Sequence, residues 1–145
     1  MSIPTGQYGD ITVAYGIFGQ NNIVLWSDFS NSTPPVENQT VEQNALNWAD
    51  GKIAMMFRNS RYKTPLVCND TNTLSVVQNW EAVYVAVQLY GRYGFRDDDL
   101  NYNRIQHELK RVQTEVTQIL ISQYQLNCSL NGNTPTVPAV IAVLG

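Results

Sequence analysis

The stretch of residues 73–91 constrains the fold most, because apolar side chains recur in it at helical steps around nearly the whole circumference. Much of the side opposite the main face is filled by Ala82, Val85, Ala86 and Leu89. A helix that is apolar on every side has to be covered on every side. The pattern therefore predicts a central, buried helix in the middle of a bundle. Its main face carries Leu74, Val76, Val77, Trp80, Val83, Tyr84, Val87 and Tyr90.

Two amphipathic helices are predicted to pack against this central one. Residues 36–60 place apolar side chains mainly along one broad face, and Pro65 requires that helix to end before Thr64. The last helix begins at the aspartates 97–99, which cap it and complement its positive end, and it frays near Leu126. Its seam has the three-four spacing of an antiparallel bundle or of a coiled coil. The seam residues are Tyr102, Ile105, Leu109, Val112, Val116 and Ile119.

The N-terminal region is predicted to add shorter helical pieces. Residues 10–19 read as a short helix that stops at a glycine. Residues 21–29 fit one or two further helical turns, although their β-branched and aromatic residues leave a strand open as the alternative. We therefore expect an all-α bundle of about four main helices in residues 1–130, followed by an extended C-terminal arm in residues 131–145.

The strongest apolar faces define the predicted core. Tryptophans 26, 48 and 80 fall in three different predicted helices and are interpreted as core anchors rather than as a ligand-binding box. The positions expected in the core are Trp48, Ile53, Phe57, Trp80, Val83, Val87, Leu109, Val112, Val116 and Ile119.

The charge content is informative, because Asp, Glu, Lys and Arg make up 14% of the chain, against roughly 25% in an average globular protein. Amide side chains fill the gap, and an amide-rich surface loses less solvation energy than a charged one when a contact buries it. This favours an assembly subunit. A net charge of −3 argues against a general basic surface that grips nucleic acid. The chain also lacks an apolar stretch approaching the roughly 18 residues of a membrane helix and begins without a secretion signal, so we expect a protein made in the cytoplasm.

The sequence offers little that could carry catalysis. Cys68 and Cys128 are isolated and are interpreted as thiols, with a bridge between them as the less favoured alternative. An enzyme using Cys68 would need His107, the only histidine, to approach it in space. No hydrolase, zinc-protease or phosphate-loop motif is present. We therefore expect no enzyme, no cofactor and no metal site, and we interpret the aspartates 97–99 as helix caps rather than cation ligands.

Two regions are candidates for contact with partners. Arg58, Arg61 and Lys63 form a cation cluster that either complements the end of a helix or contacts DNA phosphate, with Tyr62 available to stack on a base. The C-terminal arm is too apolar for a free solvated end, and Pro138 prevents a helix from starting earlier. We expect the arm to pack on a neighbouring subunit or to add a strand to a partner, an arm folded back on its own bundle being the alternative. Its candidate contact residues are Val137, Val140, Ile141, Val143 and Leu144.

Two runs of the sequence share their order and spacing with a known family. The first, Phe18-Gly19-Gln20-Asn21-Asn22-Ile23-Val24-Leu25-Trp26-Ser27-Asp28, ends a short helix in Phe-Gly and continues with a polar-Ile-x-x-aromatic-Ser-Asp step. The second has Ala49-Asp50 in a helix and then Arg61-Tyr62-Lys63-Thr64-Pro65-Leu66. A buried helix and a long amphipathic helix follow. Over roughly residues 8–125 the chain thus resembles the small helical head-tail connector proteins of tailed phages, including the head-completion proteins of Mu-like phages.

The resemblance implies a structural subunit of a closed ring, usually of about twelve copies. Such a ring docks on the portal protein at the head vertex and joins the DNA-filled head to a downstream neck or tail protein. DNA passes through its centre without tight binding, and the protein resides in the virion. The resemblance implies no catalytic residue. The rival interpretation, favoured by the cation cluster, is a small helical DNA-binding or regulatory protein.

Overall fold

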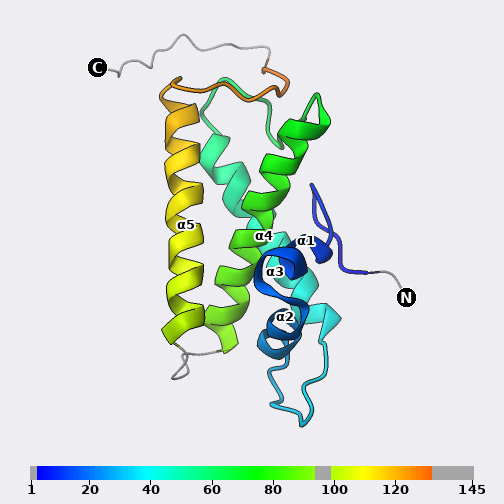
Figure 1. The fold of residues 1–145 in the computed structure, drawn as a ribbon. Coiled ribbons are helices and arrows are strands. Elements are labelled where there is room, and N and C mark those ends of the chain that lie inside the picture. Colours follow the sequence, from blue (N-terminus) through cyan, green and yellow to red (C-terminus); the bar gives the residue numbers. More distant parts are fainter. Residues whose placement is uncertain (1–2, 94–98, 132–145) are drawn as a thin grey trace.

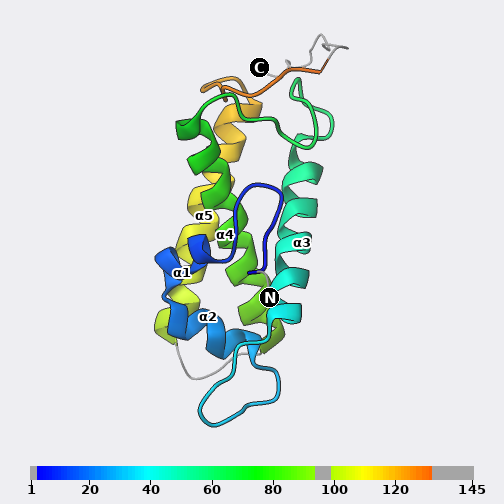
Figure 2. The same cartoon turned by 90° about the vertical axis from the view of Figure 1, so that its right-hand side faces the viewer.

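The computed structural model describes residues 3–93 and 99–131, and within them the protein is built from helices (Figure 1). The helices are α1 (Thr12–Phe18), α2 (Gln20–Ser27), α3 (Gln39–Phe57), α4 (Thr71–Tyr93) and α5 (Asp99–Leu120). The three long helices, α3, α4 and α5, run side by side in alternating directions, while α1 and α2 cover part of one side (Figures 1 and 2). The expected all-α bundle is confirmed.

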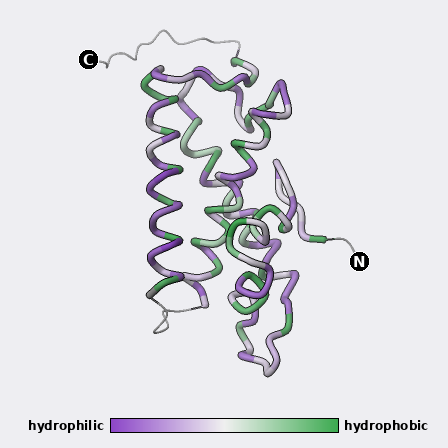
Figure 3. Tube along the Cα trace, in the orientation of Figure 1, coloured by the Kyte–Doolittle hydropathy of each residue, from purple (hydrophilic) through white to green (hydrophobic). Residues whose placement is uncertain are grey.

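Helix α4 is the centre of the bundle, as its apolar circumference predicts. Among the helices that the structure describes, it packs against each of the other four. The seven consecutive residues from Trp80 to Ala86 are all buried, so no side of this part of the helix faces solvent. In contrast, α5 packs mainly against α4, and most of its residues are hydrophilic (Figure 3).

Most of the predicted core is confirmed. Of the predicted residues, Ile53, Phe57, Trp80, Val83, Val112, Val116 and Ile119 are buried. The other three predicted residues, Trp48, Val87 and Leu109, are only partly buried and pack against the edge of the core. The prediction omitted an N-terminal contribution, since Ile11, Phe18 and Ile23 are almost completely excluded from solvent. Trp26, which is 2% exposed, joins them as the expected anchor.

The structure corrects the predicted ends of two helices. Helix α3 begins at Gln39 rather than near residue 36, because the Val36 N–H donates to Asp28 Oδ2 at 3.1 Å and the Asn38 side chain caps the helix at Val41 N. Helix α5 ends at Leu120 rather than near residue 126. The chain turns there, with Ser122 at a positive φ of 66°. Residues 21–29, for which a strand was the alternative, are helical through Ser27.

The segment before α1 is fastened to the middle of the bundle by two acidic side chains. Glu81 on α4 accepts hydrogen bonds from the backbone N–H groups of Tyr8 and Gly9, and Asp50 on α3 accepts one from Gln7 N at 2.8 Å. A Cβ at Gly6 would lie 2.3 Å from Glu81 Oε2, so only glycine lets the backbone come this close. The segment is therefore an integral part of the fold.

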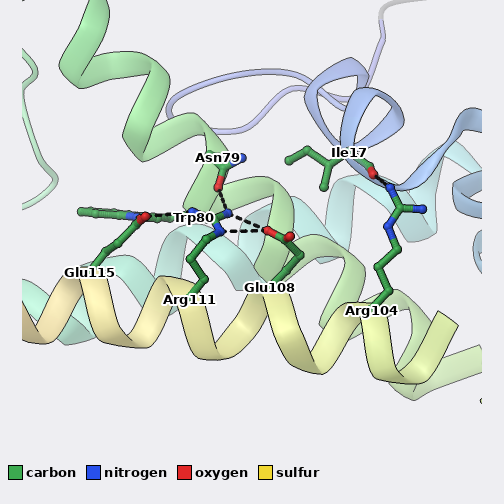
Figure 4. A network of polar contacts seen from close by, with 7 residues as sticks. All are labelled: Ile17, Asn79, Trp80, Arg104, Glu108, Arg111 and Glu115. Carbon is green, nitrogen blue, oxygen red and sulfur yellow. Dashed lines mark hydrogen bonds and ion pairs between the residues drawn. The ribbon is translucent and has the colours of Figure 1, made fainter. Parts of the chain in front are cut away.

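A polar network joins α5 to α4 (Figure 4). Arg111 on α5 forms ion pairs with Glu108 at 2.7 Å and Glu115 at 2.9 Å and donates to Asn79 on α4. Glu115 also accepts from Trp80 Nε1 at 2.9 Å. The network thus satisfies the one polar group of the most buried tryptophan and fixes the register of α5 on α4.

Candidate partner-binding surface

One end of the bundle gathers most of the features that the sequence marked as candidates. After α5 the chain crosses this end as an irregular segment, residues 121–131, which we call the strap (Figure 1). The strap runs antiparallel to the α3–α4 loop, residues 58–70, and we call the two segments together the strap end. Backbone hydrogen bonds of 2.9 to 3.0 Å join them, with Lys63 N donating to Ser129 O, Ser129 N to Val67 O, Asn69 N to Asn127 O and Asn131 N to Arg61 O.

Tyr62 is the anchor between the two segments. Its ring is 2% exposed and packs edge-on against Phe57, and its hydroxyl accepts from Leu126 N at 3.0 Å. The Arg61 guanidinium lies over the Tyr62 ring at 5.2 Å and donates to Ser122 Oγ at 2.9 Å. These contacts hold the beginning of the strap on the bundle.

The three residues of the predicted cation cluster have different roles: Arg61 is bound within the fold, whereas Arg58 and Lys63 are exposed. Arg61 is engaged with Tyr62 and Ser122, so its guanidinium serves the fold, and it lies beyond the last turn of α3, which ends at Phe57. Arg58 directly follows that last residue and is exposed, as is Lys63. Two of the three candidate cations consequently project toward solvent at the strap end, where a partner could reach them.

The strap end also exposes large apolar side chains that the sequence pattern did not single out. Their exposed fractions range from 43% to 62%. Exposed apolar residues that gather at one end of a protein are candidates for contact with other molecules. The only signal in the sequence was that two further apolar residues, Leu120 and Ile121, directly follow the seam residue Ile119. The exposed residues are Val67, Leu120, Ile121, Tyr124 and Leu130.

The C-terminal arm begins at this same end. Asn131, the last residue that the structure describes, donates from its side chain to Ser60 O at 3.0 Å and from its backbone to Arg61 O. The arm's start is thus bound to the strap end. The candidate contact residues Val137, Val140, Ile141, Val143 and Leu144 lie outside the described residues.

The structure does not bring the candidate catalytic residues together. His107 is exposed in the first half of α5, whereas Cys68 lies in the α3–α4 loop at the strap end, opposite Cys128. With a rise of about 1.5 Å per residue, the 13 residues from His107 to Leu120 span roughly 20 Å. The neighbour of Cys68 is instead Cys128, with the two Sγ atoms 3.8 Å apart. Within residues 3–93 and 99–131, no group of three or more His, Cys, Asp or Glu side chains is arranged to hold a metal ion.

The aspartates 97–99 lie almost wholly outside the described residues. Asp99 is the first residue of α5, in agreement with the predicted start of that helix.

Two buried glutamates, Glu42 and Glu81, change the electrostatics of the protein. Burial raises the pKa of Glu81 to about 9 and that of Glu42 to about 9, and a neighbouring carboxyl, Asp50 or Glu37 respectively, adds to each rise. Both groups are therefore protonated at pH 7. The formal net charge of −3 counts them as ionised, so without these two negative charges the charge at pH 7 is near −1. The molecule is less acidic than its composition suggests.

A comparison of the chain with protein-family models, with curated proteins and with solved structures finds no match in any of the three. No helix in the described part of the chain has the length and apolarity to cross a membrane.

Proposed function

We propose that this protein is a structural subunit of a phage head-tail connector ring, which docks on the portal and joins the DNA-filled head to the tail. Its work is geometric, with DNA passing through the centre of the ring, and it requires no catalysis and no cofactor. The protein would reside in the virion, at the head-tail junction.

The observation that carries the proposal is that the residues behind the family resemblance are the ones that shape this fold. In the first run, Gly19 has a positive φ of 93° at the corner between α1 and α2, where other residues are strained. Phe18, Ile23 and Trp26 are buried on either side of that corner. Asp28 then accepts backbone hydrogen bonds from the loop that follows.

The second run has the same character. Asp50 binds the N-terminal segment through Gln7 N. Arg61 and Tyr62 anchor the strap, and Leu66 is buried at 5% exposure. A resemblance made of fold-determining residues supports a shared architecture more strongly than one made of scattered surface positions. It supports the connector function through that shared architecture.

The distribution of surface types fits a ring subunit. The outer side of α5 exposes amides and hydroxyls, which can be buried against a neighbouring subunit with a small loss of solvation. The strap end exposes apolar residues and is also where the arm begins, which suits docking on the portal or on the next neck component. The exposed amide and hydroxyl residues on α5 are Asn103, Gln106, Gln113, Thr114 and Thr117, and the exposed basic residues beside them are Arg104, His107 and Lys110.

The alternative function is a small helical DNA-binding or regulatory protein. Arg58 and Lys63 favour it, because both are exposed at one end of the bundle. Replacing both with alanine should weaken DNA binding and reduce its salt dependence if they contact phosphate. A connector subunit should instead bind duplex DNA weakly both before and after the replacement.

Native mass spectrometry combined with electron microscopy of the purified protein, over a range of concentrations, tests the proposal. We expect closed rings, of about twelve subunits by the family resemblance, with a central opening. A protein that remains monomeric and binds duplex DNA tightly, with a steep salt dependence, would support the alternative.

A further inference from the structure

At one position the strap and the α3–α4 loop each carry a cysteine, and the two cysteines face each other. Cys68 and Cys128 are 60 residues apart in the chain, yet they form an antiparallel bridge pair. The notable feature is the register of this pair, because it decides whether the two side chains can be joined.

The backbone hydrogen bonds on either side define that register. Asn69 N donates to Asn127 O, and Ser129 N donates to Val67 O, each at 2.9 Å. Both bonds flank the cysteine pair, so Cys68 and Cys128 occupy a non-hydrogen-bonded site of the antiparallel ladder. At such a site the two Cα atoms are about 4.5 Å apart and the side chains lie close together. This separation falls inside the range of roughly 4.4 to 6.8 Å that disulfides span.

The side chains are already directed at one another. The two Sγ atoms are 3.8 Å apart, so rotation about the side-chain bonds, with little backbone movement, can bring them to bonding distance. The segments are also fixed by their neighbours, since Asn127 donates to Asp70 Oδ2 at 2.7 Å next to the pair. The folded backbone therefore places the two thiols next to each other before any bond forms between them.

From this geometry we propose that Cys68 and Cys128 are a site of covalent modification, at which an intrachain disulfide closes and locks the strap onto the α3–α4 loop. In a cytoplasm that reduced glutathione keeps reducing, the two cysteines stay as thiols. In oxidising surroundings the Cys68–Cys128 disulfide forms and persists. The lock lies three residues before Asn131, so it fixes the base from which the C-terminal arm begins.

The chemistry is a thiol–disulfide exchange with a small disulfide such as oxidised glutathione. Cys68, the more exposed of the two, loses its proton and attacks one glutathione sulfur, releasing the first glutathione thiolate. The Cys128 thiolate then attacks Cys68 Sγ in this mixed disulfide and releases the second. Two protein thiols are oxidised by two electrons, and one oxidised glutathione becomes two reduced molecules. Burial raises the pKa of the Cys128 thiol to about 12, so the second step should become faster as the pH rises.

The test uses the full-length chain, fully reduced and then incubated with oxidised glutathione without denaturant. Intact-mass measurement should show the loss of two hydrogen atoms, and peptide mapping should find Cys68 joined to Cys128. The Cys128→Ser variant should instead retain glutathione on Cys68, with about tenfold or more adduct than the native chain, because no neighbouring thiol displaces it. Cys128→Ala serves in its place if the serine variant does not fold.

A functional readout accompanies the mass measurement. Oxidation should raise the melting temperature of the native chain and slow amide exchange in the strap, and neither change should occur in Cys68→Ser. The proposal is overturned if the main products are glutathione adducts on both cysteines or disulfides between chains. It is also overturned if both thiols of the folded chain stay free under conditions that oxidise the denatured chain.

Discussion

The buried carboxyl groups predict an unusual dependence of stability on pH. Glu81 has a pKa of about 9 in the folded protein, against its ordinary value of 4.5, so the folded state holds its proton more tightly than the unfolded state does. The stability that this group contributes is fully present below about pH 4.5 and is lost progressively as the pH rises toward 9. The same sign applies to Glu42.

The magnitude follows from linkage. Each such group lowers the free energy of unfolding by about 1.4 kcal/mol for every pH unit between the two pKa values. From pH 5 to pH 7 the loss is therefore about 3 kcal/mol per carboxyl, an appreciable part of the roughly 5 to 15 kcal/mol that stabilises a typical domain. On the acid side, Asp28 opposes this trend, because the Val36 N–H and other donors hold its pKa below the usual range. The free energy of unfolding should therefore be largest near about pH 4 to 5.

Urea denaturation of the native chain and of Glu81→Gln, measured at several pH values from 5 to 8, tests this account. The variant replaces the protonated carboxyl with a neutral amide of nearly the same shape. It should reduce the slope of unfolding free energy against pH by about 1.4 kcal/mol per unit and be least harmful at pH 8. Tyr8→Phe is the control: the pKa of Tyr8 is raised to about 12, so its loss should cost about the same at every pH in this range. An unchanged slope in Glu81→Gln would refute the reasoning.

Three further perturbations test the fold and its strap end. Trp80→Ala should lower the free energy of unfolding by about 3 to 5 kcal/mol, because the ring is fully buried and stacks on Phe57 with 5.8 Å between the ring centroids. The same truncation at the partly buried Trp48 should cost less. Equal melting temperatures for Trp80→Ala and the native chain would contradict the described core. Arg61→Ala should speed amide exchange at Leu126, because it removes the contacts of Arg61 with Tyr62 and Ser122, worth about 1 to 2 kcal/mol together. Lys63→Ala, a substitution of an exposed cation nearby, is the control and should leave the exchange rate unchanged. Deletion of residues 132–145 should preserve the circular dichroism and melting of the bundle while abolishing incorporation into heads, and a deletion that unfolds the chain would show that the arm belongs to its own core.

The central helix was predictable because the pattern of apolar residues within it indicates that it is buried on every side. A helical stretch with apolar side chains on every side, such as the one around Val83, is shielded from solvent only in the middle of a small helical protein. The seam of α5 was predictable for a related reason, since Val112 and Val116 recur at the spacing of one helix face. Periodicity within one helix carried both predictions.

The strap end could not be predicted, because its contacts join residues that are distant in the chain. Nothing local to Tyr62 indicates that its hydroxyl meets Leu126, and helical spacing continued through residues that the structure places in the strap. Arg61 was read as a cation for a helix end or for phosphate, whereas tertiary structure gave it Ser122 as a partner. The facing of Cys68 and Cys128 has the same origin, since only the folded chain sets their register.

The proposed place of the protein in the virion is tested most directly by labelling. Antibodies raised against the purified chain, or a gold-labelled tag on it, can be imaged by electron microscopy on phage particles produced by cells that carry its gene. The connector function predicts label at the junction of head and tail, and tailless heads when the gene is disrupted. Complete particles that form without the protein and carry no label at that junction would contradict it.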